Sequence, residues 1–206
     1  MSLEVWITFL IASSALLAVP GPTVLLVVSY ALGRGRQTGW ATVPGVALGD
    51  FTAMTASLLG AGAVLAASAT LFTALKICGA AYLIWLGIRL WKARPTLDDA
   101  PERRASDSAR RMFWHAYVVT ALNPKGIVFF VAFVPQFVDP SQPVLLQFAI
   151  LEGTFLALAA ANTIAWVVMA GSLQSHFRDP AVLRWVNGAG ASCLIGAGLL
   201  TAFARR

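Results

Sequence analysis

The chain has 206 residues, of which 58% are hydrophobic and only 12% are charged, and its formal net charge is +6. Water-soluble domains carry about a quarter charged residues, so the composition excludes an ordinary soluble domain and favours a protein that spans a lipid bilayer. The positive charge does not indicate nucleic-acid binding, because the basic residues lie between the hydrophobic segments, where membrane topology explains them.

Six hydrophobic segments are long enough to cross a membrane, which takes about 20 apolar residues. Runs of this length without alternating polarity form helices rather than the strands of a membrane barrel. We therefore expect an all-α integral membrane protein with six transmembrane helices, in which residues 1–206 form a single membrane domain. The predicted spans cover, approximately, residues 3–32, 40–65, 70–91, 113–138, 144–170 and 183–204.

The first span is interrupted by AVPGPTVLL at residues 18–26. Gly21 can cap a helix and Pro22 suits a first helical position, so we expect one helix to end here and another to begin. Pro22 lies ten residues before Leu32 at the inner end of the span. This spacing places the break about 15 Å into a hydrocarbon core about 30 Å thick. A proline kink that only shapes packing is the alternative.

The fourth span is interrupted in the same way by ALNPKGIVFF at residues 121–130. Asn123 is a favoured N-cap and Pro124 suits the next position, and this break also falls about 15 Å from the inner end of its span. Both restarted helices would turn amino-terminal N–H groups toward the membrane centre, where such ends bind anions. The candidate residues for binding a substrate carboxylate are Gly21, Pro22, Thr23, Asn123, Pro124 and Lys125.

A polar connection at about residues 94–111 divides the spans three and three. Since three is an odd number, a repeat at about 1–93 and a repeat at about 112–206 would have opposite orientations, as in many secondary transporters. The positive-inside rule places the connection in the cytoplasm and both termini outside, although Arg205 and Arg206 oppose this orientation. The basic residues that support it are Arg34, Arg36, Arg89, Lys92, Arg94, Arg103, Arg104, Arg110, Arg111, Arg178 and Arg184.

Three charged residues, Asp50, Lys125 and Glu152, lie well inside predicted spans. Each would cost about 2.5–3.5 kcal/mol at the centre of a helix, so mutual pairing or function must offset the cost. Lys125 could neutralise one carboxylate while the other is protonated, because burial disfavours the charged form. We favour the functional interpretation, in which Asp50 or Glu152 binds a substrate ammonium or takes up a coupling proton.

Several motifs recur in a characteristic order along most of the chain. They are PGPTVLLVVSYALGRGRQTGW, GVALGDFTAM, LKICGAAYLIWLGIRLWKA and ALNPKGIVFFVAFVPQFV, followed by a glycine-rich final span. In this order they resemble the LysE/RhtB family of amino-acid exporters. The resemblance implies a six-span carrier of the inner (plasma) membrane, driven by the proton gradient. The pairing of Gly49-Asp50 with ILEGTF most resembles the leucine and neutral amino-acid branch of that family.

The leading hypothesis is therefore an amino-acid/proton antiporter that needs no cofactor. Its partners would be the lipid bilayer, protons and a neutral, branched-chain, homoserine-like or threonine-like amino acid, and a homo-oligomer is compatible with the sequence. Export of a metal cation or another small solute is the alternative. We expect no metal site, because His115 and His176 are peripheral, Cys78 and Cys193 lack CxxC spacing, and Lys125 would repel a cation. The absence of GxSxG and HExxH motifs argues against an enzyme.

Overall fold

The computed structural model describes residues 1–18, 21–34, 39–92, 108–139 and 141–173, together with the single positions 188, 191, 192, 195, 196 and 199. Within these ranges all regular secondary structure is helical, which confirms the predicted all-α class. The sixth predicted span and the predicted linker lie for the most part outside the described residues. The same is true of these basic residues used to predict orientation: Arg36, Arg94, Arg103, Arg104, Arg178, Arg184, Arg205 and Arg206.

The length and composition of the helices confirm a membrane protein. Helices α4 and α8 are each long and apolar enough to cross a membrane. The bent pair formed by α1 and α2 and the bent pair that runs from α6 to η3 are also long and apolar enough when each pair is counted as one span. The two helices of the first pair meet at 57° and those of the second at 41°. The helical elements are α1 (Leu3–Ala18), α2 (Pro22–Arg34), α4 (Thr42–Ala67), α5 (Ala69–Lys92), α6 (Ala109–Ala121), α7 (Pro124–Val128), the π-helical turn η2 (Phe129–Phe133), the 3-10 turn η3 (Val134–Phe137) and α8 (Val144–Leu173).

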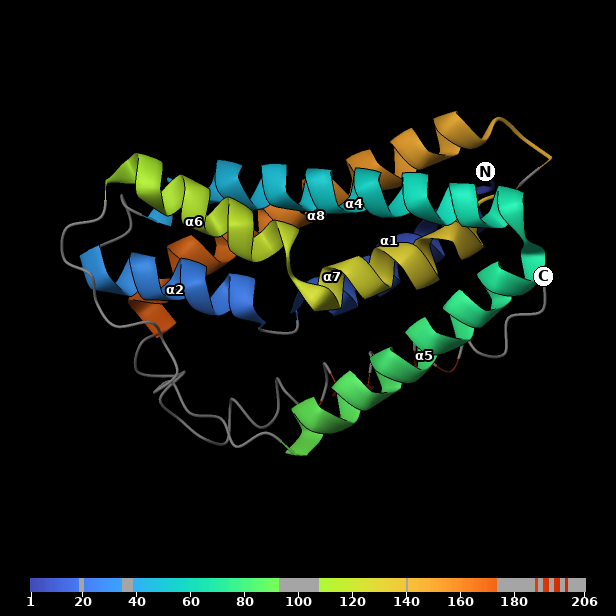
Figure 1. Ribbon diagram of the computed structural model, residues 1–206. Coiled ribbons are helices and arrows are strands. Elements are labelled where there is room, and N and C mark those ends of the chain that lie inside the picture. Colours follow the sequence, from blue (N-terminus) through green and yellow to red (C-terminus); the bar gives the residue numbers. More distant parts are fainter. Residues whose placement is uncertain are drawn as a thin grey trace.

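The two bent pairs run in opposite directions through the middle of the molecule (Figure 1). The pair α1–α2 starts near the end of the molecule marked N, whereas α6 and α7 lead back toward that end. Helix α2 packs against α6, and α1 packs against η3, so the two bends lie near each other at the centre. Helix α4 packs mainly against α6 and η2, helix α8 packs against α1 and α2, and α4 and α8 also pack against each other. Helix α5 packs against α7 and η2. The centre of the molecule is therefore the place where two helices end and two begin.

Helix α4 approaches α6 closely because the α4 residues at the contact are glycines. A Cβ atom added at Gly49 would lie 2.8 Å from the carbonyl oxygen of Tyr117 and 2.8 Å from the Cβ of Thr120, too close for any side chain. Gly45, one turn earlier, meets a backbone carbonyl of α6 in the same way. Small residues four apart allow helix backbones to approach each other in membranes. Since Asp50 follows Gly49 directly, this contact places Asp50 beside the end of α6.

Buried apolar side chains form two clusters at different levels along the helices. The phenylalanine cluster consists of Phe9, Leu16, Ala53, Met54, Leu58, Phe129, Phe130, Phe133, Val134, Val138, Leu151, Phe155 and Ala159. The valine cluster consists of Leu26, Val27, Val46, Ala116 and Val167. Large apolar side chains also cover the outside, where Leu3 is 69% and Leu145 is 81% exposed. An apolar exterior of this kind is expected when lipid is the solvent.

The phenylalanine cluster is packed ring against ring. The π-helical turn η2 turns Phe129, Phe130 and Phe133 inward, where each is at most 3% exposed. Ring centroids lie 4.9 Å apart for Phe129 and Phe133, 5.0 Å for Phe133 and Phe137, and 4.9 Å for Phe130 and Phe155. Aromatic pairs at such distances contribute about 0.5–1.5 kcal/mol each beyond the burial of their area. These ring contacts therefore add to the stability of the phenylalanine cluster.

The glycine contact between α4 and α6 predicts opposite effects for two alanine substitutions in the same helix. Gly49→Ala places a methyl group against backbone atoms that cannot move cheaply, so it should lower the free energy of unfolding by about 1–3 kcal/mol. The matched control is Gly60→Ala, which meets no described atom within 4 Å. It should be neutral or stabilise the helix by about 0.5–1 kcal/mol. Unfolding in detergent measures both, and equal stabilities would contradict the close approach of α4 and α6.

Candidate functional site

Asn123 joins the start of α7 to the start of α2. Its Oδ1 accepts a hydrogen bond from the backbone N–H of Lys125 at 3.1 Å, so the side chain is the N-cap of α7, and Pro124 occupies the first turn. Its Nδ2 donates to Thr23 Oγ1 at 3.3 Å. Thr23 Oγ1 also lies 3.2 Å from Thr120 Oγ1 in the last turn of α6. One amide and two hydroxyl groups thus connect both breaks.

Lys125 extends from the first turn of α7 to the end of α1. Its Nζ donates to the backbone carbonyl of Leu16 at 3.1 Å. Leu16 lies in the last turn of α1, where carbonyl groups have no partner within the helix and the helix dipole is negative. A cation is electrostatically misplaced at the start of its own helix but well placed at the end of another. A Cβ atom added at Gly21 would lie 3.4 Å from Lys125 Nζ, so the backbone of the break passes close to the ammonium.

Asn162 of α8 binds the next carbonyl of the same helix end. Its Nδ2 donates to the backbone carbonyl of Leu17 at 3.2 Å. Two side chains from different helices therefore supply donors to the last turn of α1. The sequence analysis did not single out Asn162, although an amide in the middle of the apolar 30-residue helix α8 is a signal that could have found it. Trp166 also reaches this site. Its presence in the sequence does not indicate a binding site, because tryptophan is common near membrane interfaces.

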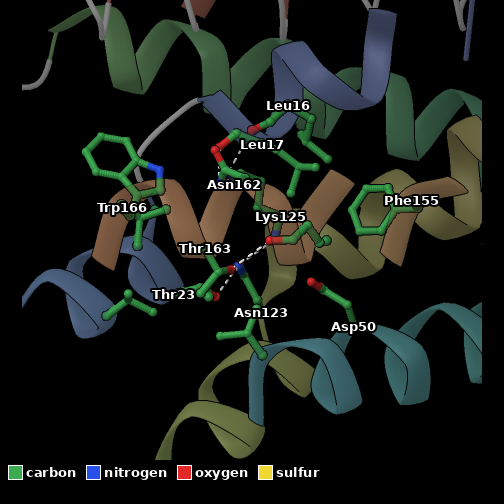
Figure 2. Close-up of a pocket in the computed structure, with 16 residues that line it drawn as sticks. Leu16, Leu17, Thr23, Asp50, Asn123, Lys125, Phe155, Asn162, Thr163 and Trp166 are labelled. Atoms are coloured by element: carbon green, nitrogen blue, oxygen red, sulfur yellow. Dashed lines mark hydrogen bonds between the residues drawn. The ribbon is translucent and has the colours of Figure 1, made fainter. Parts of the chain in front are cut away.

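A cavity of about 40 Å³ lies where these elements meet (Figure 2). The carboxyl group of Asp50 and the ammonium of Lys125 both face it. The cavity borders both apolar clusters, because its lining includes members of each. The lining residues are Leu16, Leu17, Gly21, Thr23, Val24, Val27, Val46, Asp50, Asn123, Lys125, Gly126, Phe155, Ala159, Asn162, Thr163 and Trp166.

The structure brings five of the eight predicted site residues together at this cavity: Gly21, Thr23, Asn123, Lys125 and Asp50. Pro22 and Pro124 belong to the first turns of their helices but are exposed and are not among the described lining residues.

Glu152 lies elsewhere, half-buried between α8 and α4. Its Oε1 accepts a hydrogen bond from Thr55 Oγ1 at 2.6 Å. Ten residues of α8 separate Glu152 from Asn162, which corresponds to about 15 Å along the helix. The two candidate carboxyl groups therefore occupy different places and are not equivalent.

The arrangement offers complementary charges to a small molecule and few ligands to a metal. Within the described ranges, no group of three or more histidine, cysteine, aspartate or glutamate residues is placed to hold a metal ion. Cys78 is exposed, and Cys193 lies outside the described residues. A carboxyl group and an ammonium in one cavity match a ligand that has both charges, and the apolar clusters on either side strengthen such electrostatic contacts by excluding water.

Comparison with known proteins identifies the family. The family described as LysE type translocator matches residues 14–205. The chain belongs to this family. This LysE-type translocator is 31% identical to a homoserine/homoserine lactone efflux protein of Salmonella typhimurium over 205 residues, which cover 100% of this chain and 99% of that protein. It is 28% identical to a leucine efflux protein of Salmonella choleraesuis over 175 residues, which cover 85% of this chain and 82% of that protein.

Another relative of this LysE-type translocator is an uncharacterized membrane protein of Vibrio cholerae, 31% identical over 205 residues that cover 100% of both chains. No solved structure matches the chain. The relatives with functional names are efflux proteins, so the expectation of a transporter rather than an enzyme is confirmed.

The N-cap at Asn123 can be tested by comparing two substitutions. Asn123→Ser and Asn123→Ala both remove the donor to Thr23, but serine keeps an oxygen that can cap α7 whereas alanine does not. We expect Asn123→Ala to be the less stable by about 1 kcal/mol, measured by unfolding in detergent.

Ser108→Ala is the matched control, because Ser108 Oγ caps the exposed start of α6 by accepting from Arg111 N at 3.3 Å. It should lose stability without losing transport, whereas Asn123→Ala should lose both. Equal stability of Asn123→Ser and Asn123→Ala would show that the cap does not hold the break.

Proposed function

We propose that the protein exports amino acids or their close derivatives in exchange for protons. The observation that best supports this function is the presence of Asp50 and Lys125 in one cavity at the meeting point of two broken helices. A free amino acid has an ammonium and a carboxylate on the same carbon, so its charges are complementary to these two side chains. The names of two relatives, a homoserine/homoserine lactone and a leucine efflux protein, suggest a neutral, branched-chain, homoserine-like or threonine-like substrate.

Binding would exchange one set of partners for another. Lys125 now donates to the Leu16 carbonyl, and a substrate carboxylate would bind its ammonium together with N–H groups near Gly21, Thr23 and Asn123. The substrate ammonium would take the position opposite Asp50, close to the negative end of α1. Pro22 and Pro124 would contribute by starting the two helices rather than by contact. The zwitterion would thus replace the internal bond of Lys125 without leaving a buried charge unpaired.

Coupling to protons follows from competition for Asp50. Its carboxyl group can bind either the substrate ammonium or a proton, so arrival of a proton from outside would favour release of the substrate. Glu152 lies between Asp50 and the end of the molecule where α1 begins, and we assign it a role in proton transfer rather than in ammonium binding. Each charge moved through the membrane potential would add about 2.3 kcal/mol of driving force per 100 mV.

The wider architecture belongs to the same proposal. Residues 1–206 would form one transporter domain of six transmembrane helices in the inner (plasma) membrane, with two inverted repeats at about 1–93 and 112–206. The opposite directions of α1–α2 and α6–α7 support inverted repeats. The basic residues Arg89 and Lys92 at the end of α5, and Arg110 and Arg111 at the start of α6, support a cytoplasmic connection at 94–111 and termini outside.

Export of a metal cation remains the second candidate within transport. Hard cations need several clustered oxygen ligands, and softer ones need thiolate or imidazole groups. The cavity has one carboxyl group and an ammonium that would repel a cation. Growth in the presence of toxic cations, without any amino-acid efflux, would favour this alternative.

The two charged residues of the cavity predict a difference between homoserine and homoserine lactone, since the lactone retains the ammonium but has no free carboxylate. Lys125→Met should weaken export of homoserine about tenfold or more, because charged hydrogen bonds contribute about 1.5–3 kcal/mol. It should affect the lactone less. Asp50→Asn should impair both compounds, because both present an ammonium. Efflux from preloaded cells or vesicles provides the measurement.

A panel of labelled amino acids, with and without a protonophore, gives the reference for this experiment. If the wild type accelerates the efflux of no amino acid, the proposed function is wrong. If Lys125→Met reduces the export of homoserine and of the lactone equally, Lys125 does not bind the substrate carboxylate.

The separation of Asp50 from Glu152 predicts two kinds of transport defect. Glu152→Gln should abolish the pH dependence of net export while leaving exchange of internal for external substrate in place. Asp50→Asn should impair both net export and exchange. Glu4→Gln is the matched control, because Glu4 is an exposed carboxyl group in the first turn of α1. If Asp50→Asn and Glu152→Gln both leave efflux and its pH dependence intact, the coupling mechanism is wrong.

A further inference from the structure

The cavity is too small for a complete amino acid. A water molecule needs about 10–15 Å³ of such space, so a volume of about 40 Å³ holds roughly three waters. That is enough for an ammonium and a carboxylate but leaves no room for a substrate side chain. Part of the cavity wall must therefore move when a substrate binds, and the packing of the wall determines which part can do so.

Two aromatic side chains of α8 lie on opposite sides of Lys125 in the cavity, Phe155 and Trp166 (Figure 2). They are eleven residues apart, which is three helical turns, so they project from the same face of α8 about 16 Å apart. Each forms the apolar boundary of the cavity on its own side. Phe155 lies on the side of the phenylalanine cluster and Trp166 on the side of the valine cluster.

The wall of the cavity at Phe155 cannot move easily. Phe155 is 1% exposed, and its ring centroid lies 4.9 Å from that of Phe130 and 6.0 Å from that of Phe129. The rings of Phe133 and Phe137 extend the same packed set. Displacing Phe155 would disrupt several buried ring contacts at once, because closely packed interiors respond as a unit.

The Trp166 side of the cavity is less deeply buried. Trp166 is only partly buried and lies at the margin of the valine cluster, and its neighbours in the cavity wall include Val24, Val27 and Val46. These three side chains are short and β-branched, so a shift of the indole would open space beside them. Helix α8 runs away from the end marked N in Figure 1, so Trp166, which is nearer the carboxyl end of α8, lies closer than Phe155 to the end where α2 finishes. That is the cytoplasmic end in the proposed orientation.

We propose that Trp166 is the movable wall of the cavity and limits the size of the substrate side chain that the protein accepts. The inference rests on the proposed export of amino acids and adds to it a residue that determines specificity. The main-chain charges of the substrate bind Asp50 and Lys125, and its side chain enters the space that Trp166 leaves beside the three valines. The indole opens toward the cytoplasm, where the substrate enters.

Competitive efflux of alanine, valine, leucine and phenylalanine from cells or vesicles tests the size limit. In Trp166→Ala the preference for phenylalanine over alanine should rise about tenfold or more, the usual effect of changing the size of an apolar pocket. Trp166→Phe should give an intermediate preference. This variant keeps an aromatic ring, so it still tests the inference if the alanine variant does not fold. Trp114→Phe is the matched control, because Trp114 is 48% exposed on α6 and should leave the preference unchanged. An unchanged preference in both Trp166 variants would overturn the inference.

Thiol labelling tests, independently of the substrate, which side of the cavity is accessible from the cytoplasm. In a Cys78→Ser, Cys193→Ala background, Trp166→Cys should react with a membrane-impermeant maleimide applied from the cytoplasmic side, and Phe155→Cys should not. Equal labelling of the two cysteines, or labelling of Phe155→Cys alone, would overturn the inference. If the wild type exports no amino acid, the proposed function fails, and labelling still decides whether the cavity is accessible from the cytoplasm at position 166 rather than at position 155.

Discussion

The site depends on how the protein satisfies the end of α1 inside an apolar interior. A helix that stops there leaves carbonyl groups without partners, and each such group costs several kcal/mol in hydrocarbon. Lys125 and Asn162 donate to the carbonyls of Leu16 and Leu17 and remove this cost. The lysine comes from the start of α7, so the start of one helix supplies a donor that the end of another lacks. Removing Lys125 would therefore affect the fold and the cavity together.

Close backbone contacts determine where the polar groups lie. Gly49 allows α4 to approach α6, and this approach places Asp50 beside the break that Asn123 caps. Both apolar clusters border the polar groups, and electrostatic interactions in such apolar surroundings are stronger than at a surface. The two clusters differ in their packing, because several ring-to-ring contacts join the side chains of the phenylalanine cluster. A transporter needs such an asymmetry, since one side of its cavity must stay closed while the other opens.

Local rules account for the features that sequence reasoning recovered. Hydropathy was sufficient to predict helices and a membrane, and both are confirmed. The motifs were sufficient to recognise the family to which the chain belongs. Capping chemistry involves residues that are adjacent in the chain, which is why Asn123 and Pro124 could be singled out at the start of α7. In contrast, the sequence could not distinguish the roles of Asp50 and Glu152. Hydropathy indicates how deep a residue lies in a span, but it does not indicate which helix packs beside that residue.

The sequence by itself determined that the protein is helical and membrane-embedded, and that charged and helix-breaking residues occur within its apolar segments. Those properties follow from the composition of each segment and from contacts between residues close in the chain. Only the tertiary structure decided that Lys125 binds the end of α1, that Glu152 lies outside the cavity, and that Asn162 and Trp166 belong to it. These contacts join residues that are 97 to 145 positions apart, so they depend on how helices pack rather than on any local pattern.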